Sequence, residues 1–328
     1  MKIVISGGSG QVGTVLARAF HGDRHDVVVL SRSPRPRRWR VVAWDGSSVG
    51  SWSRELDGAD VVINLAGRSV NCRYTAANRK QMIDSRVQST RAVGEAIAKA
   101  SLPPRVWLQA STATIYAHRY DVANDEATGI LGGHEPDAPE TWRFSIDVAR
   151  AWEQAFTDVA TPLTRKVALR SAMTMSPDPG GIFDTLMSLV RHGVGGRAGD
   201  GRQFISWIHH EDFVRAIRWL IDRDHIAGAV NLASPNPLPN ADFMRTLRRV
   251  SGVAIGLPAT NWMLEIGALF MRTETELILK SRRVVPGRLL ESGFAFTFPI
   301  WQDAALDLVR RWHATRRPST ARLQAAAS

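Results

Sequence analysis

The chain has a single cysteine, Cys72, among 328 residues. One thiol excludes an intramolecular disulfide, so a reducing compartment is expected and the thiol itself has no assigned role. The sequence also lacks an apolar run of roughly 18 residues, the minimum for a membrane-spanning helix, and it lacks the basic and then apolar pattern of a secretory signal. These absences predict a soluble, cytoplasmic protein with no membrane partner.

Lysine is also scarce, because 37 of the 42 basic residues are arginines and only 5 are lysines, although the net charge is +11. We interpret this skew as a compositional bias. The arginines cluster at residues 32–40 and 310–322 without an interleaved aromatic platform for stacking bases. We therefore expect no nucleic-acid partner, with nucleic-acid binding as a minor alternative. A monomer or a homodimer is expected.

Short β-branched runs alternate with helical patterns in the first half of the chain, which is typical of a doubly wound parallel sheet. Strands are predicted at Ile3–Ile5, Val27–Leu30, Val41–Trp44, Val61–Leu65, Val106–Leu108 and Val167–Leu169, and helices at Gly13–Phe20, Thr75–Ala100 and Phe144–Phe156. Beyond residue 170, glycine- and proline-rich connections predict a smaller α+β lobe. Its elements are helices at Ile182–Arg191, Glu211–Ile221, Ala241–Val250 and Trp301–Trp312, and a strand at Ala229–Leu232.

Three glycines punctuate the first strand-to-helix turn. Gly7, Gly10 and Gly13 follow the apolar run that ends at Ile5. Glycines let the backbone approach a pyrophosphate, and the N–H groups and dipole of the following helix favour an anion. A glycine turn alone is a weak signal, but its strand–turn–helix context indicates a dinucleotide site in a Rossmann-type fold.

The end of the second strand bears on the choice of cofactor. An acidic residue there would bind the ribose 2′-hydroxyl of NAD, but this chain has Ser31 and Arg32. A guanidinium and a hydroxyl suit a 2′-phosphate, so we predict NADP. The alternative is that Arg32 is one more surface arginine in an arginine-rich loop.

A longer series of motifs resembles a known family. Asn64-Leu65-Ala66-Gly67 is followed by Arg73-Tyr74-Thr75 and by Asp84 to Thr90 on a long helix. The series resembles the atypical, YfcH-like branch of the NAD-dependent epimerase/dehydratase superfamily, which are extended short-chain dehydrogenase/reductases. In that branch an N-L-A-G turn precedes an R-W-T segment. The stretch from Pro286 to Phe294 is similar to the C-terminal domain of unknown function that the branch carries.

The resemblance implies an NADP-binding domain over residues 1–170, to which later segments return. It also implies a substrate lobe over residues 171–312, with the C-terminal domain starting near residue 255. Residues 313–328 lack apolar periodicity, which predicts a disordered tail. Together with the glycine turn, the resemblance predicts the cofactor-binding residues. They are Gly7, Gly8, Ser9, Gly10, Gln11, Val12, Gly13, Ser31, Arg32, Leu65, Ala66, Gly67, Gln81, Arg86 and Met173.

The fifth strand ends in Ala110-Ser111-Thr112-Ala113-Thr114-Ile115-Tyr116, which is similar to the S-S-S-A-T-V-Y element of extended epimerases. The resemblance implies Thr112 as the catalytic hydroxyl and Tyr116 as a second catalytic residue lining the cleft. A threonine-rich strand end is equally expected from β-propensity. The usual Tyr-x-x-x-Lys pair is missing: Phe144 replaces the tyrosine, and Asp147 lies near the place of the lysine.

Two adjacent histidines, His209 and His210, point apart on a helix, so we predict no metal site and expect helix capping by His209 or Asp212. Two functions remain open. The first is an oxidoreductase or epimerase acting on a small carbonyl or sugar-like substrate. The alternative is a non-catalytic NADP(H)-binding sensor or interaction module, which the missing pair favours.

Overall fold

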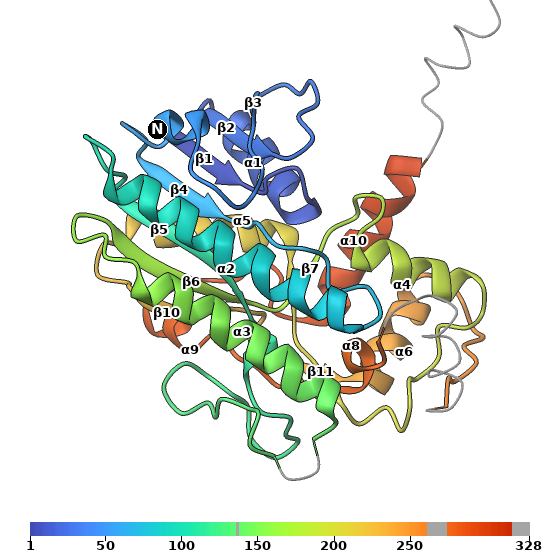
Figure 1. Cartoon of the computed structure of the whole chain (residues 1–328). Coiled ribbons are helices and arrows are strands. Elements are labelled where there is room, and N and C mark those ends of the chain that lie inside the picture. Colours follow the sequence, from blue (N-terminus) through green and yellow to red (C-terminus); the bar gives the residue numbers. More distant parts are fainter. Residues whose placement is uncertain (136–137, 261–273, 317–328) are drawn as a thin grey trace, which may run out of the picture.

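The core of the protein is a seven-stranded, fully parallel sheet, seen in the computed structural model that describes residues 1–135, 138–260 and 274–316 (Figure 1). The strand order is β10-β6-β5-β4-β1-β2-β3. Their bounds are β1 Lys2–Ser6, β2 Asp26–Ser31, β3 Arg40–Ala43, β4 Val61–Asn64, β5 Val106–Thr112, β6 Arg165–Ser171 and β10 Gly228–Leu232. The predicted Rossmann-type sheet is confirmed.

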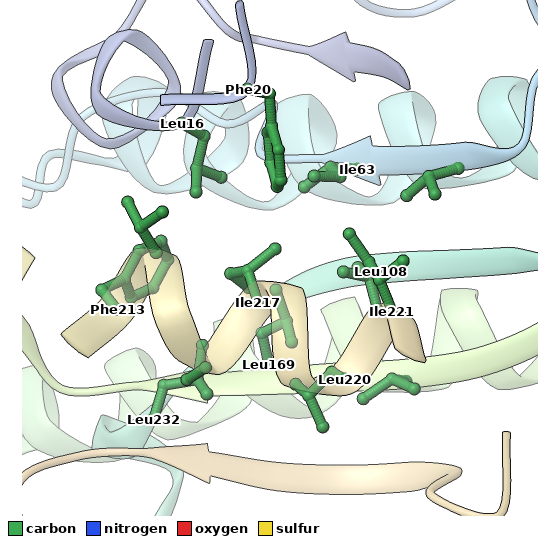
Figure 2. Packing of buried hydrophobic residues seen from close by; sticks show 14 of the residues in the cluster. Leu16, Phe20, Ile63, Leu108, Leu169, Phe213, Ile217, Leu220, Ile221 and Leu232 are labelled. Carbon is green, nitrogen blue, oxygen red and sulfur yellow. The ribbon is translucent and has the colours of Figure 1, made fainter. Parts of the chain in front are cut away.

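The central strands are apolar on both faces, since successive side chains point to opposite sides of a sheet that helices cover twice. In β1, Ile3 and Ile5 enter one hydrophobic cluster and Val4 enters another. Helices α1 (Gln11–Gly22) and α5 (His210–Asp222) cover the first face. Figure 2 shows Leu16 and Phe20 of α1 and Phe213 and Ile217 of α5 meeting the strand residues there. Helices α2 (Ala76–Ala98) and α3 (Glu140–Asp158) lie against the other face.

Two elements expected in the second lobe belong to the sheet. Strand β10 pairs with β6, and α5 packs with α1 on the sheet. The lobe itself forms a separate cluster around Trp207 and Trp301. Its elements are β7 Met173–Met175, α4 Ile182–Arg191, β8 Phe204–Ile205, β9 Trp207–His209, β11 Leu238–Pro239, α6 Asn240–Val250 and α10 Trp301–Arg316. Two short helices precede α10: α8 Glu276–Leu279, and α9 Gly287–Glu291, whose Leu289 packs into the sheet cluster.

The last helix runs farther than expected. Residues 313–316 are helical rather than part of a disordered tail, because Trp312 donates a hydrogen bond to Asp184 and Arg316 forms an ion pair with the same carboxylate. Residues 317–328, and the part of the predicted C-terminal domain at 261–273, lie outside the described residues.

Side chains occupy the free edge of β10. The Arg288 guanidinium donates to the carbonyls of Ala227 and Ala229, the latter at 2.8 Å. The Glu126 carboxylate accepts the Asn231 N–H at 2.7 Å and the Arg288 N–H at 3.2 Å. Polar backbone groups at this edge are therefore paired without a further strand. Within the described ranges, no helix is long and apolar enough to cross a membrane.

Candidate cofactor and substrate site

The glycine turn between β1 and α1 leaves no room for side chains at two of its positions. Gly7 has a φ of +71°, in the left-handed region, and a Cβ there would lie 2.8 Å from the Ala66 backbone. A Cβ on Gly13 would lie 2.4 Å from the Gly8 Cα. Gly10 differs, because its added Cβ would meet only the Gly7 carbonyl oxygen, at 3.6 Å. The space beside Gly10 thus belongs to the cleft.

The turn opens onto a cleft of about 530 Å³ at the carboxyl ends of β1, β2 and β4. Nine of the predicted cofactor residues line it: Gly7, Ser9, Gly10, Ser31, Arg32, Leu65, Ala66, Gly67 and Gln81. The buried Asn64 shapes one wall, since its Oδ1 accepts the Ala66 N–H at 3.1 Å and its amide donates to Gln109 at 3.0 Å. This pairing explains why an asparagine ends β4 in the N-L-A-G segment.

Ser31 and Arg32 lie at the ribose end predicted for the cofactor. The Ser31 hydroxyl donates to Ser9 at 3.1 Å, which ties β2 to the glycine turn. The Arg32 side chain is exposed, runs past Gly46, and has no ion-pair partner among the residues that the structure describes. A guanidinium at the rim of a cleft, without a carboxylate of its own, suits an anionic ligand group.

Gln11 supplies a test of whether the cleft fits a dinucleotide. Its buried Nε2 has no hydrogen-bond partner, and it lies so close to Gly181 that a Cβ there would be 1.9 Å away. A buried amide without a partner carries a desolvation cost that a ligand oxygen would remove. The residues present therefore fit the predicted cofactor, whose phosphates would lie on the helix N-terminus.

The other six predicted cofactor residues, Gly8, Gln11, Val12, Gly13, Arg86 and Met173, are not among those that line the main cleft. Val12 packs partly into the core cluster under the sheet, so only its backbone is near the turn. Gly8 lines an adjoining hollow of about 220 Å³. Met173 begins β7 and pairs with Trp207, and the cofactor contact predicted for its backbone stays a prediction.

A second pocket, of about 230 Å³, lies beside the end of β5. Thr112, Phe144 and Val148 line it, so the places of the usual tyrosine and lysine are both apolar. Asp147, expected near the lysine position, is exposed and does not line the pocket. Val148, the next residue on α3, lines it instead, because one residue along a helix turns the side chain by about 100°.

Arg86 separates the pocket from the cleft. It is buried in α2, lines the pocket, and packs beneath Gly67 of the cleft, where a Cβ would lie 3.3 Å from it. Its guanidinium donates to the Met82 carbonyl at 2.9 Å and lies 4.9 Å from the Trp152 ring centroid. Burial lowers the pKa of Arg86 to about 10. This cation therefore faces the pocket without a carboxylate partner among the described residues.

The expectation that Tyr116 lines the cleft is also wrong. Its buried hydroxyl donates to Asn231 at 3.0 Å and accepts from Arg170 at 2.9 Å. Arg170 in turn binds the Glu153 carboxylate with two hydrogen bonds of 2.8 Å. Tyr116 is thus part of a polar network behind the pocket, joining β6, β10 and α3.

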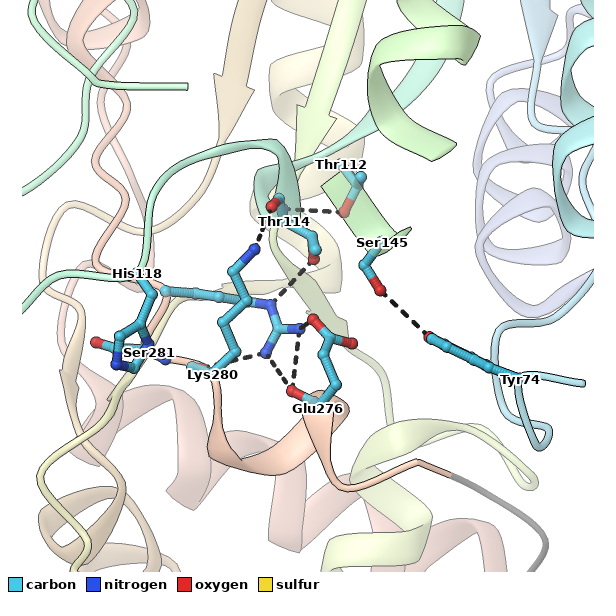
Figure 3. A network of polar contacts seen from close by, with 9 residues as sticks. Tyr74, Thr112, Thr114, His118, Ser145, Glu276, Lys280 and Ser281 are labelled. Carbon is cyan, nitrogen blue, oxygen red and sulfur yellow. Dashed lines mark hydrogen bonds and ion pairs between the residues drawn. The ribbon is translucent and has the colours of Figure 1, made fainter. Parts of the chain in front are cut away.

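The sequence reasoning did not identify Tyr74 as a pocket residue. Tyr74 precedes α2, packs edge-on against Phe144 with the ring centroids 5.2 Å apart, and directs its hydroxyl to Ser145 at 3.4 Å (Figure 3). Burial and the nearby Glu276 raise its pKa to about 12. Tyr74 stands where the R-W-T segment of the similar branch has tryptophan, and this difference was the sequence feature that pointed to it.

Glu276 completes the lining at this end of the pocket, and Lys280 lies behind the lining residue Thr114. Glu276 is 1% exposed; its Oε1 binds Arg282 at 2.6 Å, whereas its Oε2 has no hydrogen-bond partner in the described part of the chain. The Lys280 amine donates to the Thr114 carbonyl at 2.8 Å, as Figure 3 shows, and burial lowers its pKa to about 8. These groups come from α8 and its continuation, more than 100 residues away in sequence from Thr112.

The predicted capping role of His209 is confirmed. His209 is the N-cap of α5, and its Nδ1 accepts the Glu211 N–H at 3.2 Å. Burial lowers its pKa to about 3, so the ring is neutral.

Comparison with known proteins identifies the family of the chain. The sequence profile of the NAD dependent epimerase/dehydratase family matches residues 3–233. The chain belongs to this family. A second profile, that of the domain of unknown function DUF1731, matches residues 259–308 of the chain.

This family member is 30% identical over 306 residues to the epimerase family protein SDR39U1 of Bos taurus, covering 91% of this chain and 96% of that one. It is 29% identical to the epimerase family protein YfhF of Bacillus subtilis, with 94% and 98% covered. The crystal structure of human SDR39U1 with NADPH superposes with a TM-score of 0.82 at 26% identity, covering 94% and 99%. The UDP-N-acetylglucosamine 4-epimerase of Bacillus cereus, at 15% identity and a TM-score of 0.73, shares the fold.

Proposed function

We propose that this family member binds NADP(H) in the glycine-turn cleft and acts as an oxidoreductase or epimerase on a small carbonyl or sugar-like substrate in the pocket beside Thr112. The adjoining positions of cleft and pocket carry the proposal, because Arg86 borders both. The NADPH complex of human SDR39U1 supports the choice of cofactor.

Each region of the cleft has a role in holding the cofactor. Backbone N–H groups at the start of α1, together with Gln11, would hold the pyrophosphate, and Ser31 and Arg32 would bind the 2′-phosphate. A bound nicotinamide supplies or accepts a hydride. The Thr112 oxygen already accepts the Thr114 N–H at 3.1 Å, so its hydroxyl proton is available to a substrate oxygen.

Calorimetric titration with NADPH and NADH tests the proposal. Wild type should bind NADPH at least tenfold more tightly. Arg32→Ala should weaken NADPH binding by roughly 10- to 150-fold, the loss expected for one charge-assisted contact, and leave NADH unchanged. Arg38→Ala, at an exposed position outside the cleft lining, is the matched control. Equal affinities of wild type for the two cofactors would contradict the role of Arg32.

A glycine pair tests the location of the site. Gly10→Val should abolish NADPH binding and leave the apo melting temperature near that of wild type, because the added Cβ has room in the apo protein. Gly13→Val should destabilise the fold itself, since its Cβ would overlap the Gly8 backbone. Retained NADPH binding in Gly10→Val would move the cofactor elsewhere.

The second candidate function, a non-catalytic NADP(H)-binding sensor or interaction module, is favoured by one observation. Phe144 and Val148 leave the usual positions of the tyrosine and lysine apolar. Such a module would bind NADPH and bury it against the same cleft, but it would oxidise no NADPH with any carbonyl compound. Steady-state NADPH oxidation at 340 nm separates the two functions.

A further inference from the structure

The pocket contains a phenol despite the loss of the usual tyrosine. The Tyr74 ring packs against Phe144. The Tyr74 hydroxyl contacts the hydroxyl of Ser145, the residue that follows Phe144 on α3. At 3.4 Å this contact is long for a bond between two hydroxyls, so the phenol proton is only weakly engaged. Tyr74 and Thr112 line the same pocket, as the acid and the positioning hydroxyl of a carbonyl reductase must.

We propose that Tyr74 is the acid that protonates the substrate oxygen, and that the substrate is a small carbonyl compound with a neighbouring hydroxyl or amino group that donates to Glu276. The proposal rests on the proposed NADP-dependent function. Tyr74 enters the pocket from the segment before α2, whereas the missing tyrosine would have come from α3.

Charge around the pocket suits proton transfer from a phenol. After the proton leaves, a phenolate remains in a buried site, where it needs a nearby cation. Arg86 lines the same pocket without a carboxylate partner among the described residues, and both Arg86 and Arg282 interact electrostatically with Tyr74. Arg86 thus takes over the positive charge that lysine supplies in the usual pair.

The unpaired Oε2 of Glu276 indicates which group the substrate carries next to its carbonyl. Oε1 is held by Arg282, and Oε2 is buried in the pocket wall with no donor. Leaving a buried carboxylate oxygen without a hydrogen bond is costly. A hydroxyl or amino group next to the carbonyl would pair with Oε2 while the carbonyl oxygen faces Tyr74.

The size of the pocket limits the rest of the substrate. Its volume of about 230 Å³ falls below the roughly 300–1,000 Å³ of sites for drug-sized ligands. Met82, Trp152 and Phe144 make much of the wall apolar. A single ring or a short chain fits this space, and a nucleotide sugar does not.

The reduction balances as follows. The carbonyl carbon gains a hydride from NADPH, where a C–H bond breaks and NADP⁺ is left, and the electrons of the C=O π bond move to the oxygen. The Tyr74 O–H bond breaks as the new alcohol O–H bond forms, and the phenolate takes a proton from water after the product leaves. Because the pKa of Tyr74 lies near 12, the phenol is protonated and ready to donate at neutral pH.

The first test measures NADPH oxidation with 2-hydroxyacetophenone and with acetophenone, which lacks the neighbouring hydroxyl. Wild type should reduce 2-hydroxyacetophenone with the higher kcat/KM. Tyr74→Phe should lower kcat by ~10²–10⁴-fold and raise KM by at most about tenfold, because it removes the proton donor and one hydrogen bond to the carbonyl oxygen. The control Tyr120→Phe changes an exposed tyrosine outside the pocket lining and should match wild type.

The second test needs no turnover. Benzamide has a carbonyl that is not reduced, and its binding to the NADPH complex is measured by calorimetry. Tyr74→Phe should weaken it by roughly 2- to 10-fold, the loss of one hydrogen bond, and Tyr120→Phe should not change it.

The outcomes separate the levels of the proposal. Failure of wild type to bind NADPH would overturn the proposed function. Binding of NADPH without reduction of either ketone would overturn the substrate class. Equal kcat/KM for the two ketones would overturn the role of Glu276. A kcat in Tyr74→Phe above about a third of the wild-type value, or unchanged benzamide binding, would show that Tyr74 is not the acid.

Discussion

Lys280 is a buried amine close to the pocket beside Thr112, one of five lysines in the chain. Its amine donates a hydrogen bond to the Thr114 carbonyl. The positive Arg282 repels it, and the carboxylates of Glu276 and Glu135 attract it. Burial comes first among the causes that lower its pKa to about 8, and Arg282 adds to it. The folded protein therefore holds this proton less tightly than the unfolded chain does.

This difference predicts a pH dependence of stability. Between pH 8 and 10.5 the unfolded chain keeps the Lys280 proton and the folded protein loses it, so the free energy of unfolding should rise with pH, by at most about 3 kcal/mol. Lys280→Met should flatten that rise. Urea unfolding at pH 8.0, 9.0 and 9.5 measures it, below the range in which Tyr74 contributes the opposite slope.

The matched control for Lys280→Met is Lys99→Met, which removes an exposed amine on α2. It should reproduce the wild-type rise. An equal rise in wild type and Lys280→Met would show that Lys280 titrates normally.

Single side chains were the part of the site that the sequence predicted least well. Residues whose place is set by the backbone of a turn, such as Gly7, Gly10 and Gly67, line the cleft, as expected of the predicted cofactor-binding residues. Asp147 is exposed, because it lies one residue before the pocket-lining Val148 on α3. Tyr116 is buried, because its hydroxyl belongs to a polar network behind β5. Tyr74 could not be assigned to the pocket without knowing how the loop before α2 folds.

At the level of elements, Glu153 connects three of them. From α3 it accepts a hydrogen bond from Ser111 at the end of β5, at 2.5 Å, and two from Arg170 at the end of β6. Both members of the ion pair are largely buried. The strand ends that carry Thr112 are thereby held against the helix that carries Phe144.

Glu153→Gln should lower the free energy of unfolding by about 2–3 kcal/mol, because it leaves the Arg170 guanidinium without a counter-charge in a mostly buried place. Urea denaturation measures this loss. Glu95→Gln breaks an exposed pair with Lys99 on α2 and should cost less than ~0.5 kcal/mol. Similar losses in the two variants would mean that the Glu153 pair is worth no more than a surface pair.

The regular elements were predictable because their patterns are long and strongly periodic. All six strands predicted before residue 170 and the three helices between them are present, although α3 begins at Glu140 rather than Phe144. Strands β7, β8, β9 and β11 have two or three residues each, too few for a period of two to show. Their pairing depends on contacts distant in sequence.

At the scale of the whole molecule, Asp212 joins the sheet layer to the C-terminal segment. This buried carboxylate of α5 accepts the N–H groups of Thr297 at 2.8 Å and Phe298 at 2.7 Å. The two residues lead into α10, which packs in the second lobe. One side chain thus fixes where the C-terminal segment turns away from the sheet.

Asp212→Asn keeps one acceptor oxygen and leaves one of these two N–H groups unpaired. We expect a loss of about 1–3 kcal/mol in the free energy of unfolding, the cost of a buried unsatisfied donor, measured by urea denaturation. The exposed Asp222→Asn, at the other end of α5, should change it by less than ~0.5 kcal/mol. If Asp212→Asn is as stable as wild type, the segment is held by its apolar contacts alone.

The occupied edge of β10 also bears on how copies of the protein meet. An open strand edge is a template on which a second chain can add its own strand, and this is a common route to aggregation and to sheets that continue across a dimer. Here Arg288 and Glu126 already hold the groups that such a strand would bind. Copies of this chain therefore cannot extend the sheet through β10 unless Arg288 and Glu126 first release these backbone groups. A dimer would have to form through another surface.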